Sequence, residues 1–279
     1  MQIFGSIDKQ IIISGKAGVN QLSGLFGTGY DSRITFSFTV TVAAGQTVNL
    51  QLSVHTGKTA KVRWGDSRET TVSYSAGNYV SHTNVYAAAG TYNIKIVDAD
   101  NLKGFRINSP VLSANIVGAL PVNLTYLYLY GNAIAWTYSG ALPVNLTYIY
   151  LRGNSIAWTY SGALPVNLTY LRLYGNAIAW TYSGALPVNL TYVWLEGDAI
   201  AWTYTYQSYK STLSYFLYLP GTTGKWLSAT VDQVIADLKI STMAGEVNIA
   251  GNNEARTSAS DQDLVDLRAN GATVTVNEY

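Results

Sequence analysis

Residues 118–139 read GALPVNLTYLYLYGNAIAWTYS, and nearly the same 22 residues follow three more times, restarting at Gly140, Gly162 and Gly184 without a gap. Of the 22 columns, 16 are identical in all four copies. A unit this short cannot bury an apolar face by itself, so copies at a fixed period must stack on their neighbours. The sequence therefore predicts a solenoid that contains residues 118–205.

Within each copy the apolar residues follow the pattern LxxLxLxxN, as in residues 124–132. The pattern resembles the leucine-rich repeat family at every defining position of the four copies. The resemblance implies one parallel sheet, with one strand from each copy. It also implies a ladder of side chains that hydrogen bond to the backbone of the neighbouring loop. That ladder would contain Asn132, Asn154 and Asn176, and Asp198 would continue it as an acceptor only.

The repeat register extends beyond the obvious copies. Residues 96–117 carry apolar residues 22 positions before those of the first copy, so they read as a degenerate leading repeat. Residues 216–220, 247–252 and 274–276 resemble further strands, with Leu217 expected in the place of Leu127. The expected sheet passes through one apolar residue of each strand: Phe105, Leu127, Ile149, Leu171, Val193, Leu217, Val247 and Val274.

Two short helices are predicted where the strand spacing lengthens. Val231, Val234 and Leu238 lie at helical intervals after the capping candidate Ser228, and a second helix should stop at Gly271. An array of repeats needs a terminal unit that hides its open end. We therefore divide the repeat part into a solenoid over 98–225 and C-terminal capping repeats over 226–279.

The chain before the repeats has a different pattern. Residues 1–30 are Gly-rich and irregular, and we interpret them as an N-terminal arm. From Ile34 to Val42, and again from Val48 to Val54, apolar residues alternate strictly with polar ones, which indicates half-buried strands. Several short strands at this spacing predict an antiparallel sandwich over residues 31–97.

Two local motifs add a resemblance for this region. Trp64-Gly65-Asp66, followed by Tyr86 and by Gly90-Thr91-Tyr92, is similar to the PKD-type immunoglobulin-like domain, which has a WGDG-like turn and a YxxxGxY ending. Ser67 stands where that family usually has Gly. The fold class predicted for the whole chain is an immunoglobulin-like antiparallel sandwich, followed by a leucine-rich repeat solenoid with one parallel sheet and a helical C-terminal cap.

Composition argues against several classes of function. The net charge is +1 and 12% of residues are charged, so nothing in it favours binding to nucleic acid or insertion into a membrane. There is no cysteine, and the two histidines, His55 and His82, both precede the repeats. We therefore expect no metal ion, no cofactor and no catalysis. Residues 1–16 do not read as a signal peptide.

The copies can be compared with one another, and only two of their columns change chemical character. One column contains Tyr, Tyr, Arg and Trp, and the other Tyr, Arg, Tyr and Glu. Both should point away from the core, because leucines occupy the alternate positions of the strand. With a third, all-tyrosine column they form the predicted ligand-binding face: Tyr126, Tyr128, Tyr130, Tyr148, Tyr150, Arg152, Tyr170, Arg172, Tyr174, Tyr192, Trp194 and Glu196.

The tryptophans of the repeats do not vary, so we interpret them as a structural column on the loop or convex side. The sequence does not decide whether the Trp136 column or the Tyr138 column faces the core. Each copy also contains Asn-Leu-Thr, beginning at Asn123 in the first, which we attribute to the repeat rather than to glycosylation.

The resemblance to two-part proteins of bacterial surfaces and phage virions implies adhesion. The first hypothesis is a recognition module that binds a cell-surface protein or glycan through the aromatic residues, at an extracellular, cell-surface or virion location. A structural virion or assembly component with the repeats as a spacer is the alternative, and an engineered consensus scaffold is a third reading. If the first is correct, replacing Tyr150, Arg172 or Trp194 with Ala should weaken binding and leave thermal stability nearly unchanged.

Overall fold

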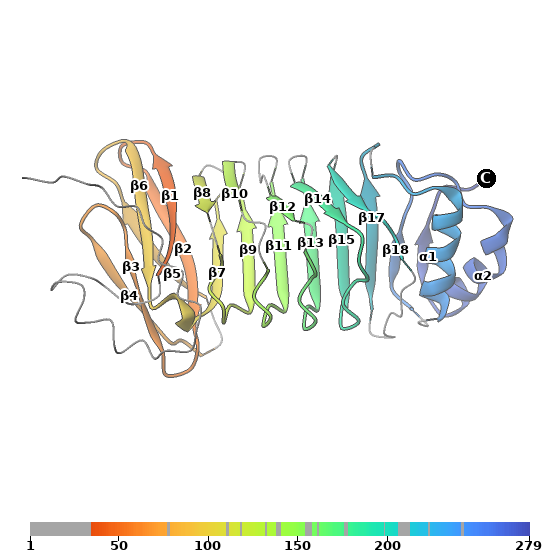
Figure 1. Ribbon diagram of the computed structural model, residues 1–279, viewed down its shortest axis with the longest axis horizontal. Helices are drawn as coiled ribbons and strands as arrows, with labels where there is room; N and C mark the ends of the chain where they lie inside the picture. The colour runs from red at the N-terminus through yellow and green to blue at the C-terminus, as the bar shows by residue number, and fades with distance from the viewer. Residues whose placement is uncertain are drawn as a thin grey trace, which may run out of the picture. The chain divides into compact units, whose positions relative to one another are not determined.

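The computed structural model describes residues 35–279 except 77–78, 110–111, 118, 132, 138–140, 154–157, 161, 176–177, 198, 206–212, 223 and 241–242. The predicted N-terminal arm lies outside this part of the chain. The described strands form sheets of ten, six and three strands. The protein is mainly β: a mixed-sheet region comes first, a β-solenoid follows, and short helices cap the C-terminal end (Figure 1).

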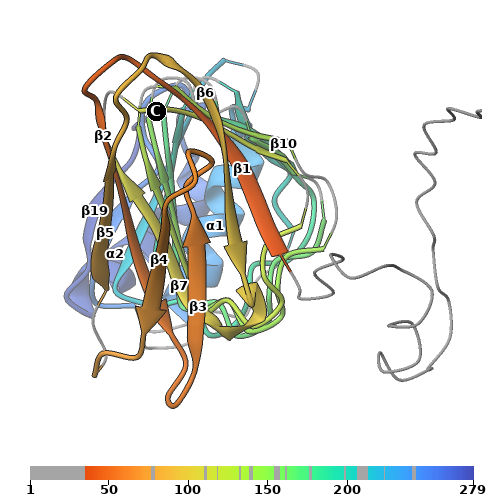
Figure 2. The ribbon, with the colours of Figure 1, turned by 90° about the vertical axis from the view of Figure 1, so that its left-hand side faces the viewer.

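The first six strands pair antiparallel in two sheets that share one core. Alternation buries Phe36 and Phe38 on one side of the first strand. Phe105 from the other sheet packs edge-on against both rings, with centroids 5.2 and 5.5 Å away. Figure 2 shows β1 and β6 on one side and β2 and β5 on the other. The strands are β1 (Thr35–Val42), β2 (Thr47–Val54), β3 (Thr59–Arg63), β4 (Glu69–Ser73), β5 (Val80–Val85) and β6 (Gly90–Val97).

Strand β7 (Leu102–Asn108) joins this region to the solenoid. It pairs antiparallel with β2 on one side and parallel with β9 (Tyr126–Tyr130) on the other, so one sheet continues through both regions. Leu102, Phe105 and Ile107 are fully buried, and Phe105 aligns with Leu127. These positions confirm the predicted leading repeat.

The four copies contribute parallel strands in a single register. Leu127, Ile149, Leu171 and Val193 align across the sheet, and each is fully buried. This confirms the predicted order of the parallel sheet. The strands after β9 are β11 (Tyr148–Arg152), β13 (Tyr170–Tyr174), β15 (Tyr192–Gly197), β17 (Tyr215–Pro220), β18 (Glu246–Asn248) and β19 (Thr273–Thr275).

The predicted alignment of Leu217 was wrong by one residue. Phe216 pairs with Val193, and Leu217 instead pairs with the outward Trp194. The shift places Phe216 and Tyr218 in the core, where both are fully buried. A tyrosine fits there because its hydroxyl donates to the carbonyl of Gly224 at 2.6 Å and accepts from the backbone of Trp202 at 3.0 Å.

A second set of strands lies on the opposite side of the solenoid, where the sequence analysis had predicted no sheet. β8 (Ser113–Val117) and β10 (Ala133–Thr137) extend the six-stranded sheet, while β12 (Trp158–Tyr160), β14 (Ile178–Tyr182) and β16 (Ile200–Trp202) pair parallel with one another. The sequence Ile-Ala-Trp-Thr-Tyr alternates large and small residues, which suits a strand that buries one face.

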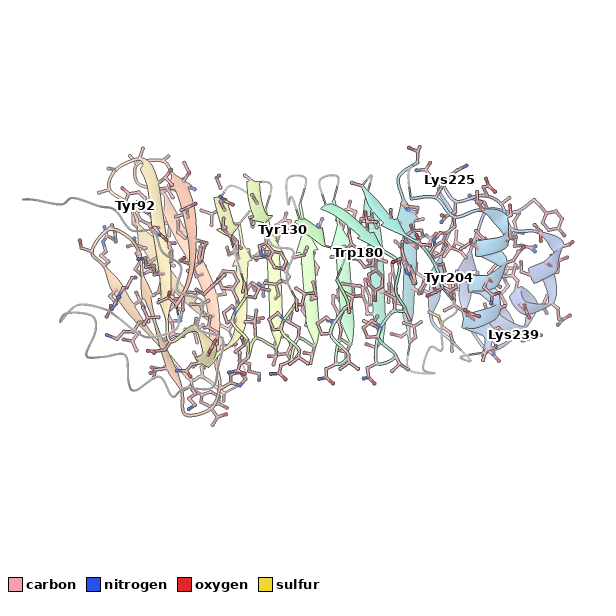
Figure 3. The ribbon with its side chains drawn as sticks, in the orientation of Figure 1. Tyr92, Tyr130, Trp180, Tyr204, Lys225 and Lys239 are labelled. Atoms are coloured by element: carbon pink, nitrogen blue, oxygen red, sulfur yellow. The ribbon has the colours of Figure 1, made fainter. Side chains whose placement is uncertain are left out.

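The tryptophan column faces the core. Trp136, Trp180 and Trp202 are at most 2% exposed, while the side chain of Trp158 lies outside the described residues. Tyr182 lies two residues beyond Trp180 on the same side, is also buried, and stacks on it at 5.1 Å. Trp180 is labelled in Figure 3. In this copy the tryptophan and the tyrosine therefore both face the core. The two alternatives that the sequence left open do not exclude each other.

Hydrogen bonds between equivalent threonines hold the repeats in register. The backbone N–H and the hydroxyl of Thr147 both donate to the carbonyl of Thr125, at 2.9 and 3.2 Å. Thr169 and Thr191 repeat these bonds to the threonine one copy earlier. At the other end of the strand, a Cβ on Gly175 would overlap the carbonyl oxygen of Gly153, so only glycine allows the copies to approach this closely.

The predicted asparagine ladder lies at positions outside the described residues, namely Asn132, Asn154, Asn176 and Asp198. Asn252 occupies the corresponding position of a later strand, five residues after Val247. Its side-chain amide donates to the carbonyl of Pro220 at 3.0 Å. This bond reaches the end of the neighbouring strand β17 and resembles the predicted one.

Two helices close the end of the array. Helix α1 (Ser228–Ile240) buries Val231, Val234 and Leu238, as the helical spacing predicted. Helix α2 (Asp261–Ala269) ends just before Gly271, whose φ of +96° is a left-handed conformation that favours glycine. The capping helices are therefore confirmed.

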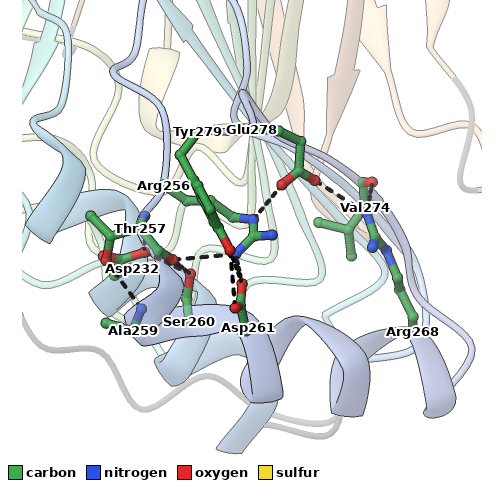
Figure 4. A network of polar contacts seen from close by, with 10 residues as sticks. All are labelled: Asp232, Arg256, Thr257, Ala259, Ser260, Asp261, Arg268, Val274, Glu278 and Tyr279. Atoms are coloured by element: carbon green, nitrogen blue, oxygen red, sulfur yellow. Dashed lines mark hydrogen bonds and ion pairs between the residues drawn. The ribbon is translucent and has the colours of Figure 1, made fainter.

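A polar network ties the end of the chain to this cap (Figure 4). Arg256 is only 9% exposed and forms ion pairs with Asp261 and with Glu278, the latter at 2.6 Å. The Tyr279 hydroxyl donates to the carboxylate of Asp261 at 3.1 Å. One guanidinium thus connects helix α2 with the last residues of the chain.

The first prediction tests the core of the solenoid. Leu129→Ala removes a fully buried side chain, so it should lower the free energy of unfolding by roughly 2–5 kcal/mol through the cavity that it leaves. Val144→Ala is the matched control, because Val144 is 62% exposed and its removal should change stability by less than about 0.5 kcal/mol. Urea denaturation of both variants measures the two effects; equal effects would contradict the assigned core.

The second prediction concerns the cap and pH. The hydrogen bond from Arg256 lowers the pKa of Asp261 below its ordinary 3.8, because it favours the charged carboxylate. A pKa lowered by folding contributes stability above the unfolded pKa, and the contribution is lost as pH falls through the folded pKa. Arg256→Gln should therefore lower the thermal midpoint near neutral pH, with a smaller difference below pH 3.8. Circular dichroism over this range tests it, and a pH-independent difference would count against it.

Candidate functional site

The twelve residues predicted to bind a ligand all lie on one side of the long sheet. Strand register aligns them in three rows across β9, β11, β13 and β15. We call this surface the aromatic face. Row A contains Tyr126, Tyr148, Tyr170 and Tyr192; row B contains Tyr128, Tyr150, Arg172 and Trp194; row C contains Tyr130, Arg152, Tyr174 and Glu196. The leucines between them are fully buried, so the outward placement is confirmed.

Row A is a stack of tyrosine rings. The rings of Tyr148 and Tyr170 lie 4.2 Å apart and those of Tyr170 and Tyr192 lie 4.4 Å apart, each pair within 11° of parallel. Tyr215 of β17 continues the stack at 4.5 Å from Tyr192. Parallel strands lie about 4.8 Å apart, so equal aromatic residues on neighbouring strands meet almost face to face. The interior rings of the row therefore cover one another's faces.

Row B combines stacked aromatic rings with guanidinium groups. The Tyr128 and Tyr150 rings stack at 4.3 Å, and Arg172 lies between the Tyr150 ring at 5.1 Å and the Trp194 ring at 3.8 Å. At the other end of the row, the guanidinium of Arg106 lies 4.2 Å from the Tyr128 ring. A cation over an aromatic face is attracted by the ring quadrupole. Both arginines are therefore held in place by the rings.

Row C carries the remaining charges. Arg152 lies between the rings of Tyr130 and Tyr174, at 5.4 and 5.3 Å. A hydrogen bond with Tyr150 raises the pKa of Arg152, so this guanidinium stays charged. Glu196 accepts a hydrogen bond from the indole N–H of Trp194 at 2.8 Å. That bond fixes the orientation of the tryptophan that Arg172 stacks on.

Stacking limits what the face exposes. Tyr126 at the end of row A is 37% exposed, whereas Tyr150 in the middle of row B is only 6% exposed. The other ten residues of the face are half-buried. The burial of Tyr150 removes the basis for the expectation that Tyr150→Ala leaves stability unchanged, because removing a buried, stacked ring leaves a cavity.

Sequence reasoning missed several members of the face. Arg106 lies 22 residues before Tyr128, so the repeat period could have found it. Tyr215 became visible only with the corrected register of β17. Tyr79 was not marked by any sequence pattern. Its ring lies over Gly104, where an added Cβ would be only 2.8 Å from it. The centroid of the same ring lies 6.0 Å from the Arg106 guanidinium.

Burial changes the acidity of the face. It raises the pKa of Tyr148 and of Tyr192, and the nearby Tyr170 phenol adds to the effect in both cases. Burial also raises the pKa of Tyr128 and of Tyr215. These hydroxyls therefore remain neutral hydrogen-bonding groups at ordinary pH.

Two hollows lie at the ends of the strands, and the smaller one borders the aromatic face. The larger, of about 640 Å³, lies along the turns that precede the strands and is lined by His55, Lys58, Asp100, Asn101, Asn123, Thr125, Asn145, Thr147 and Asn167. The smaller, of about 270 Å³, lies at the other end and includes Tyr174 and Glu196.

The Asn-Leu-Thr segments have a structural role along the larger hollow. Asn123 donates to the carbonyl of Asp100 at 3.0 Å, and Asn189 donates to that of Val166 at 3.1 Å. The threonine of each segment belongs to the ladder between copies. Both polar side chains of the segment are therefore used to connect one repeat to the next.

Among the described residues, no group of three His, Asp or Glu side chains could hold a metal ion. No helix in that part of the chain is long and apolar enough to cross a membrane. No protein family, no curated protein and no solved structure matches the chain.

The third prediction tests the stacked row. A tyrosine whose pKa is raised by folding stabilises the fold at pH values below its unfolded pKa of about 10. That contribution is lost as the pH rises through its pKa in the folded protein. In an alkaline titration of tyrosinate absorbance, part of the tyrosines should ionise late. Tyr148→Phe and Tyr192→Phe should each lower the absorbance change of that late phase by the amount of one tyrosine. The urea-unfolded chain is the control, because its tyrosines should ionise together; an unchanged late phase in both variants would argue against row A.

Proposed function

We propose that this protein is a non-catalytic recognition or adhesion module that binds its ligand through the aromatic face. The observation that carries the proposal is the position of the variation. The two columns that change character between copies both lie in outward rows, B and C, while the core varies only among Leu, Ile and Val and the threonine ladder is copied unchanged. Selection for a ligand is a simple reason for radical changes to be confined to the surface.

The physical state of the face supports binding. Tyrosine, tryptophan and arginine dominate binding hot spots because they combine large contact areas with hydrogen bonding. Here they are already ordered by stacking, so a ligand that binds them has less side-chain entropy to remove.

We also propose that the solenoid is of the leucine-rich repeat kind and that the first region is of the PKD immunoglobulin-like kind. The Tyr86 hydroxyl donates to the carbonyl of Trp64 at 2.8 Å, which links the two motifs of the resemblance. Ser67 has a φ of +73°, a conformation that favours the glycine usual at that position. This kinship favours a cell-surface, extracellular or virion location.

A structural role in a virion or assembly is the second candidate. It is favoured by the ten-stranded sheet, which continues from β5 to β19 and would make a stiff spacer. The two candidates differ in what the surface must do. A spacer needs its core and its cap, whereas a recognition module also needs its outward rows.

A glycan array and a cell-surface binding screen with the intact chain test the proposal. For the strongest binder found, Trp194→Ala should weaken binding roughly 30-fold, the effect of losing a central anchor worth about 2 kcal/mol. Arg172→Ala should also weaken it, and Tyr150→Ala should lower both affinity and stability.

Val166→Ala is the matched control. Its side chain is 59% exposed on a turn outside the face, so its loss should leave binding unchanged. If none of the face variants affects the binder, the recognition surface lies elsewhere and the proposal fails.

A further inference from the structure

The rings of the aromatic face offer a ligand their edges rather than their faces. Within row A the rings of Tyr170 and Tyr192 are each stacked on both sides, and the Tyr148 ring is stacked on one side. Trp194 is enclosed by Arg172 at 3.8 Å and by the Tyr215 ring at 5.5 Å. A sugar that stacks on an aromatic platform needs an open ring face. What remains accessible is a surface of ring edges, phenol hydroxyls and guanidinium groups.

The arginines of the face differ from those elsewhere in the described chain. Arg63, Arg68, Arg256 and Arg268 each form an ion pair with a carboxylate. The arginines of the face are Arg106, Arg152 and Arg172. Among the described residues, no carboxylate lies within ion-pair distance of any of them. They are held by rings instead, so no carboxylate of the described residues neutralises their charge in an ion pair.

Arg152 and Arg172 converge on the same ring. Their guanidinium carbons lie 5.3 and 6.0 Å from the centroid of Tyr174. Glu196, the acid of the four-copy face, is bonded to the indole of Trp194. The Nε of Arg172 is buried without a hydrogen-bond partner among the described residues. Two adjacent positive charges that form no ion pair with a described residue make a site for carboxylate, which guanidinium groups bind in a bidentate manner.

We propose that the partner of the aromatic face is an acidic protein surface, whose Asp and Glu carboxylates are bound by Arg152 and Arg172. This inference rests on the proposed recognition function and specifies its ligand. Charge complementarity requires acidic groups in the partner. A protein fits better than a glycan because the rings at the centre of the face are covered by neighbouring rings and by a guanidinium group.

The test uses a phage-displayed library of random linear peptides, selected on the immobilised intact chain. Selected peptides should be enriched in Asp and Glu relative to the unselected library. Their affinity should fall at least about tenfold on the double variant R152Q/R172Q, and it should fall with rising salt. Arg268→Gln is the control for each single replacement, because it removes one arginine charge from the cap, and it should leave affinity unchanged.

Two further variants keep the test independent of folding defects. Arg172→Lys retains the charge but loses the planar fork, so it should reduce affinity less than Arg172→Gln. Circular dichroism of each variant confirms that the fold is intact before its affinity is interpreted. An equal affinity for the native chain and the folded double variant overturns the inference.

The remaining outcomes separate this inference from the function on which it rests. Binders without acidic enrichment that are lost on Trp194→Ala overturn the acidic partner and leave recognition by the face standing. Binders unaffected by any face variant overturn both. A library that yields no binder also overturns the inference. So does a glycan array on which uronic acid glycans bind the native chain and bind R152Q/R172Q more weakly, because the carboxylate then belongs to a glycan.

Discussion

Parallel pairing in an unbroken register is the constraint on which the rest of this structure depends. Strands about 4.8 Å apart place each side chain directly beside its equivalent in the next copy. Leucine beside leucine makes a core, threonine beside threonine makes a hydrogen-bonded ladder, and tyrosine beside tyrosine makes a stack of rings at 4.2–4.5 Å. The glycine at the strand end permits the spacing, since a Cβ on Gly175 would overlap the preceding copy.

The same register explains why the core could be predicted from the sequence, whereas the aromatic face could be predicted only in part. A period of 22 predicts the inward Leu127 row, the leading repeat and the outward rows. It fails where the period changes: β15 and β17 align Val193 with Phe216, a spacing of 23 residues, and the expected Leu217 moves outward. Leucine and phenylalanine are equally apolar, so pattern alone could not choose between the two registers.

Two other features depended on contacts that no local pattern encodes. Tyr79 reaches the face from the segment between β4 and β5, and only the gap above Gly104 admits its ring. The burial of Tyr150 follows from its neighbours in the row, since alternation predicts an outward direction and says nothing of exposure. Direction is a property of one strand, whereas exposure depends on several.

The variation between copies has a consequence that single positions do not show. Replacing tyrosine in rows B and C introduced Arg152, Arg172, Trp194 and Glu196, and three of these contact one another: Arg172 lies 3.8 Å from the Trp194 ring, and the Trp194 indole donates to Glu196 at 2.8 Å. Groups in contact couple energetically, whereas distant ones add. These three residues therefore act as one unit at β13 and β15, built on a core that varies only among Leu, Ile and Val. Because the apolar core carries the stability and the varied rows carry the charge, the chemistry of the face can change without altering the fold.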